Sequence, residues 1–198
     1  MEGTCSNFAV FGGNRYTKVG QCEHPDGHDH LFAQMYPVDT WGKEYITVPF
    51  ASRLGGDLVK VLAAEEGTNV TVNNVAYELA RGEFKSFIQR EVTSVKSDKP
   101  VSVAQFSLSQ GCDGTTGDPF VVMISPNEQL MKKITFNAPS IATISKYEVT
   151  IISPSSGTAS LTFDNNDISS RFAEVPQSPG YSFATLQSSG GNHTIRSG

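Results

Sequence analysis

The chain has 198 residues, with 20 acidic against 15 basic side chains and a formal net charge of −5 at pH 7. A mildly acidic chain lacks the basic face that nucleic acids require, so we exclude nucleic acid as a partner. No apolar run approaches the ~20 residues that span a bilayer, and we therefore expect no membrane span.

The first fifty residues predict short strands separated by polar loops. An apolar run over 7–11 predicts a strand, and 14–30 is a polar loop. Residues 31–36 are apolar enough for a strand or one helical turn, which Pro37 ends because proline removes a ladder donor. Alternating side chains predict a further strand over 44–50.

From residue 57 onward, the pattern predicts a meander of short strands. β-branched residues between turn signals favour a strand over a helix in the first of these runs. The sequence Ser97-Asp98-Lys99-Pro100 is expected to turn between the last two strands. Together with the low charged fraction of 18%, this series indicates an all-β fold. The expected strands cover 57–64, 69–72, 75–80, 83–88, 92–95 and 101–106.

The same order of features then returns. The stretch Asp29–Phe50 is echoed by Asp118–Pro139, with aspartates, prolines and lysines placed 89 residues apart. Gly67–Val72 resembles Gly157–Phe163 at an offset of 90 residues. Such self-similarity predicts two tandem β-sandwich-like units of about 90 residues. We expect an N-terminal strand and polar loop over 1–28, a first unit over 29–107 and a second unit over 108–198.

The repeat leaves the second unit one strand short. The first unit ends with the strand 101–106, whereas the second stops near Arg196, where the matching strand should come. In one interpretation, the N-terminal strand Phe8–Phe11 fills this vacancy, because an open sheet edge is an aggregation hazard. In the other, the last strand of the second unit lies beyond residue 198.

Two polar loops are candidate metal sites. The first carries His24, His28 and His30, which could hold a transition metal. The second carries Asp113 and Asp118, whose oxygens could bind Ca²⁺, a hard ion that takes 6–8 oxygen ligands. Neither spacing is that of a known metal motif, and solvated loops with Asx-turns are the alternative in both places. We expect no required cofactor, with Ca²⁺ as the possible exception.

Three cysteines allow several disulfides. Cys22 and Cys112 hold equivalent places in the two polar loops and could form a bridge. Cys5 could instead pair with either one, or link to the rest of a longer chain. The sequons at Asn69 and Asn192 are candidate glycosylation sites and favour secretion.

No enzyme site can be assembled from the sequence. It has no nucleophile elbow, no phosphate-cradling loop and no His-Glu-x-x-His motif, and we predict that the protein is not an enzyme. The single tryptophan, Trp41, is more typical of a core than of a stacking platform. Its place in the second copy is held by Leu130, which favours a structural role.

Several strings together resemble the N-terminal domain of the mucus IgG-Fc-binding protein family. They cover residues from about 7 to 196, and the most specific is Pro37-Val38-Asp39-Thr40-Trp41-Gly42-Lys43. Tyr16 and His28 stand where the family commonly has cysteines. The other strings are Val10–Arg15, Asp29–Leu31, Gln34-Met35, Ser97–Val101 and Asp113–Phe120.

This resemblance implies a secreted, non-enzymatic module of an adhesive, mucus or extracellular-matrix protein. Its partner would be a protein or glycan of the extracellular surface or matrix, and the chain would continue into other domains of a longer protein. The resemblance does not imply that this chain binds immunoglobulin. A metal-dependent binding module is the alternative function.

Overall fold

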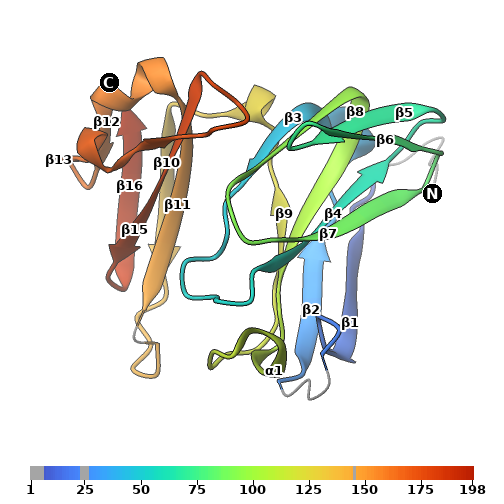
Figure 1. Ribbon diagram of the computed structural model, residues 1–198. Coiled ribbons are helices and arrows are strands. Elements are labelled where there is room, and N and C mark those ends of the chain that lie inside the picture. The colour runs from blue at the N-terminus through green and yellow to red at the C-terminus, as the bar shows by residue number, and fades with distance from the viewer. Residues whose placement is uncertain (1–6, 23–26, 145) are drawn as a thin grey trace. The chain divides into compact units, whose positions relative to one another are not determined.

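The computed structural model of the chain describes residues 7–22, 27–144 and 146–198 (Figure 1). It confirms the predicted all-β class, since strands dominate and the longest helix in the described ranges has six residues. The chain forms two compact units, residues 1–128 and 129–198, which we describe separately. No helix within the described ranges is long and apolar enough to cross a membrane.

The first unit is built from β-strands and short helical turns. The helical turns are η1 (Val38–Thr40), α1 (Gln110–Asp113) and η2 (Asn127–Gln129), the last of which reaches the boundary with the second unit. The strands are β1 (Phe11–Thr17), β2 (Asp29–Gln34), β3 (Gly42–Thr47), β4 (Asp57–Ala63), β5 (Thr68–Val72), β6 (Val75–Leu79), β7 (Phe84–Gln89), β8 (Thr93–Ser107) and β9 (Val121–Ile124).

Strand β8 organises the main sheet of the first unit. The sheet has the order β6-β5-β8-β4-β7, and β3 and β9 join it by pairing with β8. Residues 93–97 of β8 pair with β3 and β5, whereas residues 101–107 pair with β4 and β9. β9 therefore stays with the first unit, although it belongs to the stretch that we expected to open the second repeat.

The turn expected at Ser97–Pro100 is wrong, because β8 runs through it without a break. The side chain of Asp98 accepts hydrogen bonds from the backbone N–H and the Nδ2 of Asn69 at 2.9 and 2.7 Å, and so ties this part of β8 to β5. Pro100, which has no N–H, lies where β8 changes neighbours and no regular ladder bond is required of it.

The core of the first unit lies under β4, whose side chains alternate between buried and half-buried. Tyr45 closes one side of this core, with its hydroxyl donating to the Val101 carbonyl at 2.5 Å and accepting from the Gly42 N–H at 3.0 Å. The buried members are Tyr45, Val59, Val61, Ala63, Val70, Val72, Leu79, Val95, Val101 and Val103.

The second unit contains two smaller sheets. One has the order β10-β16-β12-β13 and the other β11-β15-β14. A small apolar core of Ile151, Leu161, Ile168 and Leu186 draws on both sheets. The elements are β10 (Lys133–Ala138), β11 (Tyr147–Pro154), η3 (Ser155–Ser160), β12 (Leu161–Phe163), β13 (Asn166–Asp167), η4 (Ser169–Arg171), β14 (Ala173–Glu174), β15 (Tyr181–Ser188) and β16 (Gly191–Ser197).

The N-terminal strand has a partner within the first unit, and its pairing with the second unit stays a prediction. β1 pairs with β2 in a separate two-stranded sheet, and it begins at Phe11 rather than at residue 7. The reason is local: β2 is the next strand along the chain, and its alternating side chains suit an antiparallel partner. The stretch near Arg196 is itself a strand, β16, which pairs with β10 and β12.

Candidate functional site

The hairpin of β1 and β2 has two faces of different character. Along β2 every second side chain is half-buried and the others are exposed. Leu31 and Ala33 face the main sheet, while His30, Phe32 and Gln34 face solvent. This is the alternation expected of a strand with one face on the protein and one in water.

Two aromatic rings stack on the solvent side of the hairpin. Phe11 and Phe32 lie with their ring centroids 5.6 Å apart and their planes only 6° from parallel, and they are 54% and 65% exposed. Gly13 pairs with Phe32 across the hairpin. A Cβ at Gly13 would lie 1.9 Å from the Leu31 carbonyl oxygen, so this position requires glycine.

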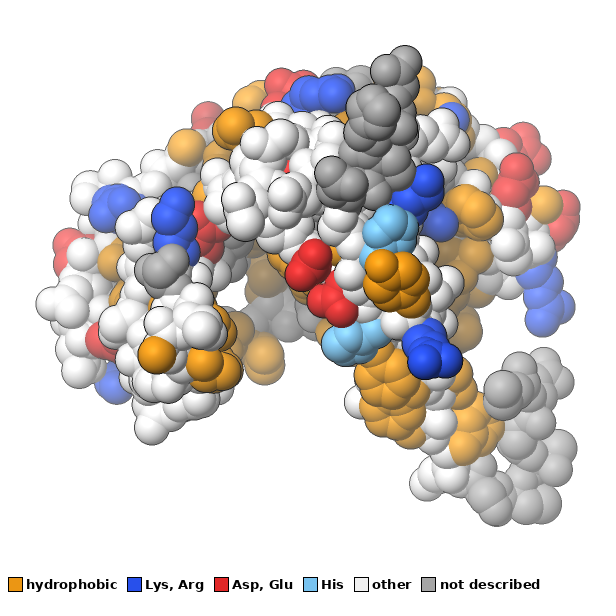
Figure 2. Space-filling model, turned by 90° about the horizontal axis from the view of Figure 1, so that it is seen from below, with side chains coloured by type: hydrophobic (Ala, Val, Ile, Leu, Met, Phe, Trp, Pro, Cys, Tyr) orange, Lys and Arg blue, Asp and Glu red, His pale blue; other side chains and the backbone are white. Residues whose placement is uncertain are grey.

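An irregularity in the pairing places a second aromatic stack farther along the hairpin. The register slips between Asn14 and Thr17, and Tyr16, 70% exposed, lies in the slip. Its ring stacks on the imidazole of His28 at 4.8 Å. We define the hairpin face as Phe11, Arg15, Tyr16, His28, His30 and Phe32. Figure 2 shows hydrophobic, basic and histidine side chains gathered on the face of the molecule seen from below.

The loop end of the hairpin, where Asp29 pairs with Thr17, also carries a fixed carboxylate. The Asp29 Oδ1 accepts a hydrogen bond from the backbone N–H of His30 at 2.7 Å and lies 3.0 Å from its Nδ1. The backbone bond, followed by the ring contact, lowers the pKa of Asp29 below its usual value. This end of the hairpin face therefore combines a histidine with a negative charge.

A cavity of about 540 Å³ lies between the inner face of the hairpin and the main sheet. Trp41 borders it, with its Nε1–H donating to the Tyr36 carbonyl at 3.1 Å. Lys60 extends from β4 into the same space, and its Nζ lies 4.8 Å from the centre of the Phe84 ring. Most of the other lining residues are apolar, and they include Leu31, Met35, Leu62, Phe106 and Met123.

A disulfide and two hydrogen bonds fix the end of the hairpin to α1. Cys22 is bonded to Cys112, which was one of the alternatives left open by the sequence. Beside it, the Val19 N–H donates to Ser109 Oγ and the Ser109 N–H donates to the Val19 carbonyl, both at 2.9 Å. Cys5 lies outside the described residues, and its pairing stays a prediction.

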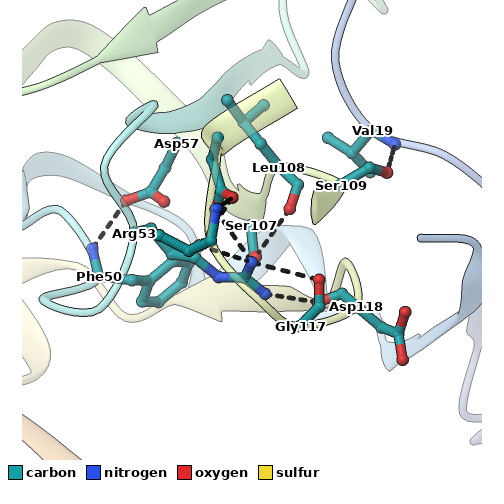
Figure 3. Close-up of polar contacts among 11 residues, drawn as sticks. Val19, Phe50, Arg53, Asp57, Ser107, Leu108, Ser109, Gly117 and Asp118 are labelled. Atoms are coloured by element: carbon teal, nitrogen blue, oxygen red, sulfur yellow. Dashed lines mark hydrogen bonds and ion pairs between the residues drawn. The ribbon is translucent and has the colours of Figure 1, made fainter. Parts of the chain in front are cut away.

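Arg53 holds the polar loop that follows α1 (Figure 3). Its Nη1 donates to the buried Asp113 carboxylate at 2.9 Å, and its Nη2 donates to the Asp118 carbonyl at 2.7 Å. Nη1 also lies 3.3 Å from the Gly117 carbonyl. In the same view Asp57 accepts a hydrogen bond from the Phe50 N–H at 2.8 Å, which fixes the segment that carries Arg53.

Three of the predicted metal ligands, Asp113, His28 and His30, each contact a different partner. Asp113 Oδ2 faces Arg53, and its Oδ1 accepts from the N–H and hydroxyl of Thr115 at 2.8 and 2.7 Å, which is the Asx-turn alternative. His28 stacks on Tyr16 and His30 contacts Asp29. No cluster of three metal-ligating side chains occurs among the described residues, which exclude His24.

Both candidate glycosylation residues are exposed on strands. Asn69 lies on β5, where its Nδ2 donates to Asp98, and Asn192 lies on β16, where its Oδ1 accepts from the Nδ2 of Asn137 at 2.7 Å. Both sites stay predictions.

The residues that build this site best were not among those predicted from the sequence. Arg53 and Ser109 act on partners 60 or more positions away, so no local pattern points to them. Phe11 and Phe32 carried a weak signal, since each is an aromatic in an alternating run beside glycine or polar neighbours.

Comparison with known proteins gives one match. A family profile described as IgGFc binding protein matches residues 4–198, which is nearly the whole chain. No curated protein matches the chain. No solved structure matches it either.

Proposed function

This chain belongs to the IgGFc binding protein family, and from that premise we propose that it is a secreted, non-enzymatic module that binds a protein partner. The proposed contact surface is the hairpin face. The observation that carries this choice is the stacked, solvent-exposed pair Phe11 and Phe32. Exposed aromatic clusters rimmed by charge are typical of protein interaction sites.

The chemistry of the hairpin face suits a protein surface. Stacked rings are rigid, so little side-chain entropy is lost when they are buried by a partner. Arg15, His28 and His30 supply hydrogen-bond donors around the rings, as in the polar rim of many interfaces. A glycan partner would also use such aromatic faces, and it is the second kind of partner to test.

The support beneath the hairpin face favours a module that acts outside the cell. The Cys22–Cys112 disulfide closes a loop of 90 residues, and such bonds persist in oxidising compartments. With the Val19–Ser109 hydrogen bonds, the disulfide fixes one end of the hairpin to α1. Binding through a loop-like element on a rigid scaffold is a common arrangement.

Binding to two immobilised probes tests the proposed function. The first is the Fc fragment of immunoglobulin G, which the family description names. The second is a purified mucin glycoprotein, which presents both protein and glycan. We expect the chain to bind at least one probe, and Phe11→Ser with Phe32→Ser to weaken that binding at least about tenfold.

The matched control is Val75→Ser, which removes a similarly exposed apolar side chain from β6, a strand of the main sheet and not of the hairpin. It should leave binding unchanged. The proposed function fails if the chain binds neither probe, or if the hairpin-face variant and the control lose affinity equally.

A further inference from the structure

The turn between β5 and β6 in the first unit has a counterpart between β12 and β13 in the second. Asn73 and Asn74 have positive φ values of 43° and 70°, and Asp164 and Asn165 have values of 50° and 67°. The Asn73 Oδ1 accepts from the Ser94 N–H at 2.9 Å. In the same way the Asp164 Oδ1 accepts from the Thr194 N–H at 2.8 Å.

The strands around these turns pair in the same way in both units. β3 and β5 flank the first part of β8, just as β10 and β12 flank β16. β4 pairs with β7 as β11 pairs with β15. Matching residue pairs are Tyr45↔Val95 with Ile134↔Ile195, Val72↔Val95 with Phe163↔Ile195, and Val61↔Lys85 with Ile151↔Ala184.

One strand of this plan differs between the units. In the first unit β4 has two neighbours, because residues 101–107 of β8 pair along the edge opposite β7. In the second unit β11 pairs with β15 alone, as far as the described residues go. Every second N–H and C=O along the other edge of β11 is therefore left without a strand partner.

The open edge of β11 carries few of the features that usually protect such edges. It keeps an unbroken register with β15 over all eight residues, so no bulge twists it away. Its only proline, Pro154, is the last residue, the nearest lysine, Lys146, lies before its start, and its one charged residue, Glu148, lies near its beginning. Natural sheets blunt exposed edges with lysine, proline or bulges within the strand. This edge is built to be paired.

The first unit shows which kind of strand belongs there. Residues 101–107 of β8 pair with β4 on one edge and with β9 on the other, and they lead into the loop of Cys112. β1 resembles this segment, but it has a strand partner on one edge only. It pairs with β2 and leads into the loop of Cys22. Its second edge has no strand partner among the described residues.

We propose that β1 of a second copy of this chain pairs antiparallel along the open edge of β11. In the first unit, residues 101–107 of β8 pair with β4 on one edge and with β9 on the other. In the proposed contact β1 takes the same kind of place, with β2 on one edge and β11 of the neighbouring copy on the other. Since each copy carries one edge of each kind, the contact joins unlike surfaces of successive copies, in a row or in a closed ring.

The matching residues also fix the register of the proposed pairing. Val10 lies beside Met35, to which its carbonyl is hydrogen-bonded at 2.8 Å, and Val103 lies beside Ile124, which is 89 residues after Met35. Val103 pairs with Val61 of β4, whose counterpart is Ile151. Val10 therefore lies opposite Ile151.

Phe8 gains most from this pairing. It lies two positions before Val10 and so points to the same side, toward the core of the second unit. It is 56% exposed in the single chain, which leaves its ring without a core of its own. Burial of this ring against the neighbouring copy is the apolar contribution to the contact.

Sedimentation velocity over a concentration series tests the proposal on the full chain. Every sample carries Cys5→Ser, so that association cannot come from a disulfide. We expect the average sedimentation coefficient to rise with concentration. Phe8→Asp should move this rise to at least about tenfold higher concentration. A peptide of residues 7–14 added in excess should abolish it, and a scrambled peptide should not.

Two controls separate this proposal from the hairpin face. Val75→Asp places the same charge on a similarly exposed apolar residue and should leave association unchanged. Phe32→Ser alters the hairpin face and should also leave it unchanged. A chain that stays monomeric throughout the series would overturn the proposal. So would an association that Phe8→Asp and the peptide of residues 7–14 do not weaken.

Discussion

Tyr45 in the first unit and Ile134 in the second hold matching places opposite Val95 and Ile195, but their surroundings differ. Tyr45 is 2% exposed and Ile134 is 41% exposed. Around Tyr45 the sheet is continued by residues 101–107 of β8, to whose first carbonyl the Tyr45 hydroxyl is bonded. The second unit, among the residues that the structure describes, has no strand in that place.

The comparison shows that similar strand pairings can give β4 a partner on both edges and β11 a partner on one edge only. The first unit surrounds β4 with strands and buries a large apolar core, whereas the second unit leaves β11 at an edge over a small one. Small cores bury a smaller fraction of their apolar surface and are correspondingly less stable. We therefore expect the two units to unfold in separate steps, and the predictions below perturb one unit at a time.

Removal of the disulfide should have the largest effect, and only on the first unit. Cys22→Ser with Cys112→Ser releases a loop of 90 residues, which by chain entropy costs about 4.6 kcal/mol. Urea unfolding followed by Trp41 fluorescence reports this unit, since Trp41 is the only tryptophan. Equal shifts in both unfolding steps would show that the units are not separate.

A cavity in the smaller core should lower the stability of the second unit alone. Leu161→Ala removes a buried side chain from its core and should cost about 2–4 kcal/mol. The far-UV circular dichroism step of the second unit should move to lower urea, while the Trp41 fluorescence step stays in place. Movement of the Trp41 step instead would contradict this assignment.

The buried hydroxyl of Tyr45 should matter less than the core methyl groups. Tyr45→Phe keeps the ring but removes the bonds to the Val101 carbonyl and the Gly42 N–H. Loss of these partners in a buried place should cost about 1–2 kcal/mol. An unchanged Trp41 fluorescence midpoint in Tyr45→Phe would mean that water satisfies both groups.

The second unit carries a pH-dependent histidine–aspartate pair, His193 with Asp164, at a place where the first unit has Thr93. His193 Nδ1 lies 2.6 Å from Asp164 Oδ2; this contact is the main cause that raises the pKa of His193 and lowers the pKa of Asp164. The histidine's contribution is complete below its ordinary pKa of 6.5 and is lost as pH rises through the raised value. The aspartate's contribution is present above 3.8 and is lost as pH falls through the lowered value.

Urea midpoints of the second unit should therefore fall as the pH rises from 6 to 9. His193→Gln should remove this dependence. The first unit has Thr93 in the matching place, opposite Thr47 as His193 is opposite Phe136, and should show no such step. A pH dependence that survives His193→Gln would assign it to another group.

Chelation should have the smallest effect. The Asp113 carboxylate is already engaged by Arg53 and Thr115, so addition of EDTA is expected to leave both thermal midpoints unchanged. Arg53→Gln serves as the contrast, because it leaves Asp113 buried without its cation and should lower the midpoint of the first unit. A fall in either midpoint with EDTA would support a structural ion instead.

Much of the fold could be predicted from alternation and turn residues. The run at 57–64 reads as a strand because β-branched residues stand between turn signals, and β4 occupies it. The turn at Ser97–Pro100 was wrong because Asp98 finds its partner on Asn69, 29 positions away, and keeps β8 extended. Local turn chemistry cannot foresee that partner.

The candidate site was less accessible to sequence reasoning. Cys22 with Cys112 was one of several pairings, chosen only by the way the hairpin folds onto α1. Arg53 had no local signal, since it bonds to Asp113 and Asp118 across 60 to 65 positions. The resemblance carried by the string around Trp41 led to the family, but it did not point to the stacked rings of Phe11 and Phe32.

Hydrogen exchange along β4 and β11 tests the open edge most directly. In dilute protein we expect all amides of β4 to be protected, because it pairs on both edges, and every second amide of β11 to exchange fast. In concentrated protein the fast amides of β11 should become protected, while Phe8→Asp keeps them fast. Uniform protection of β11 in the dilute monomer would contradict an open edge, and unchanged fast exchange at high concentration would contradict its pairing with a second copy.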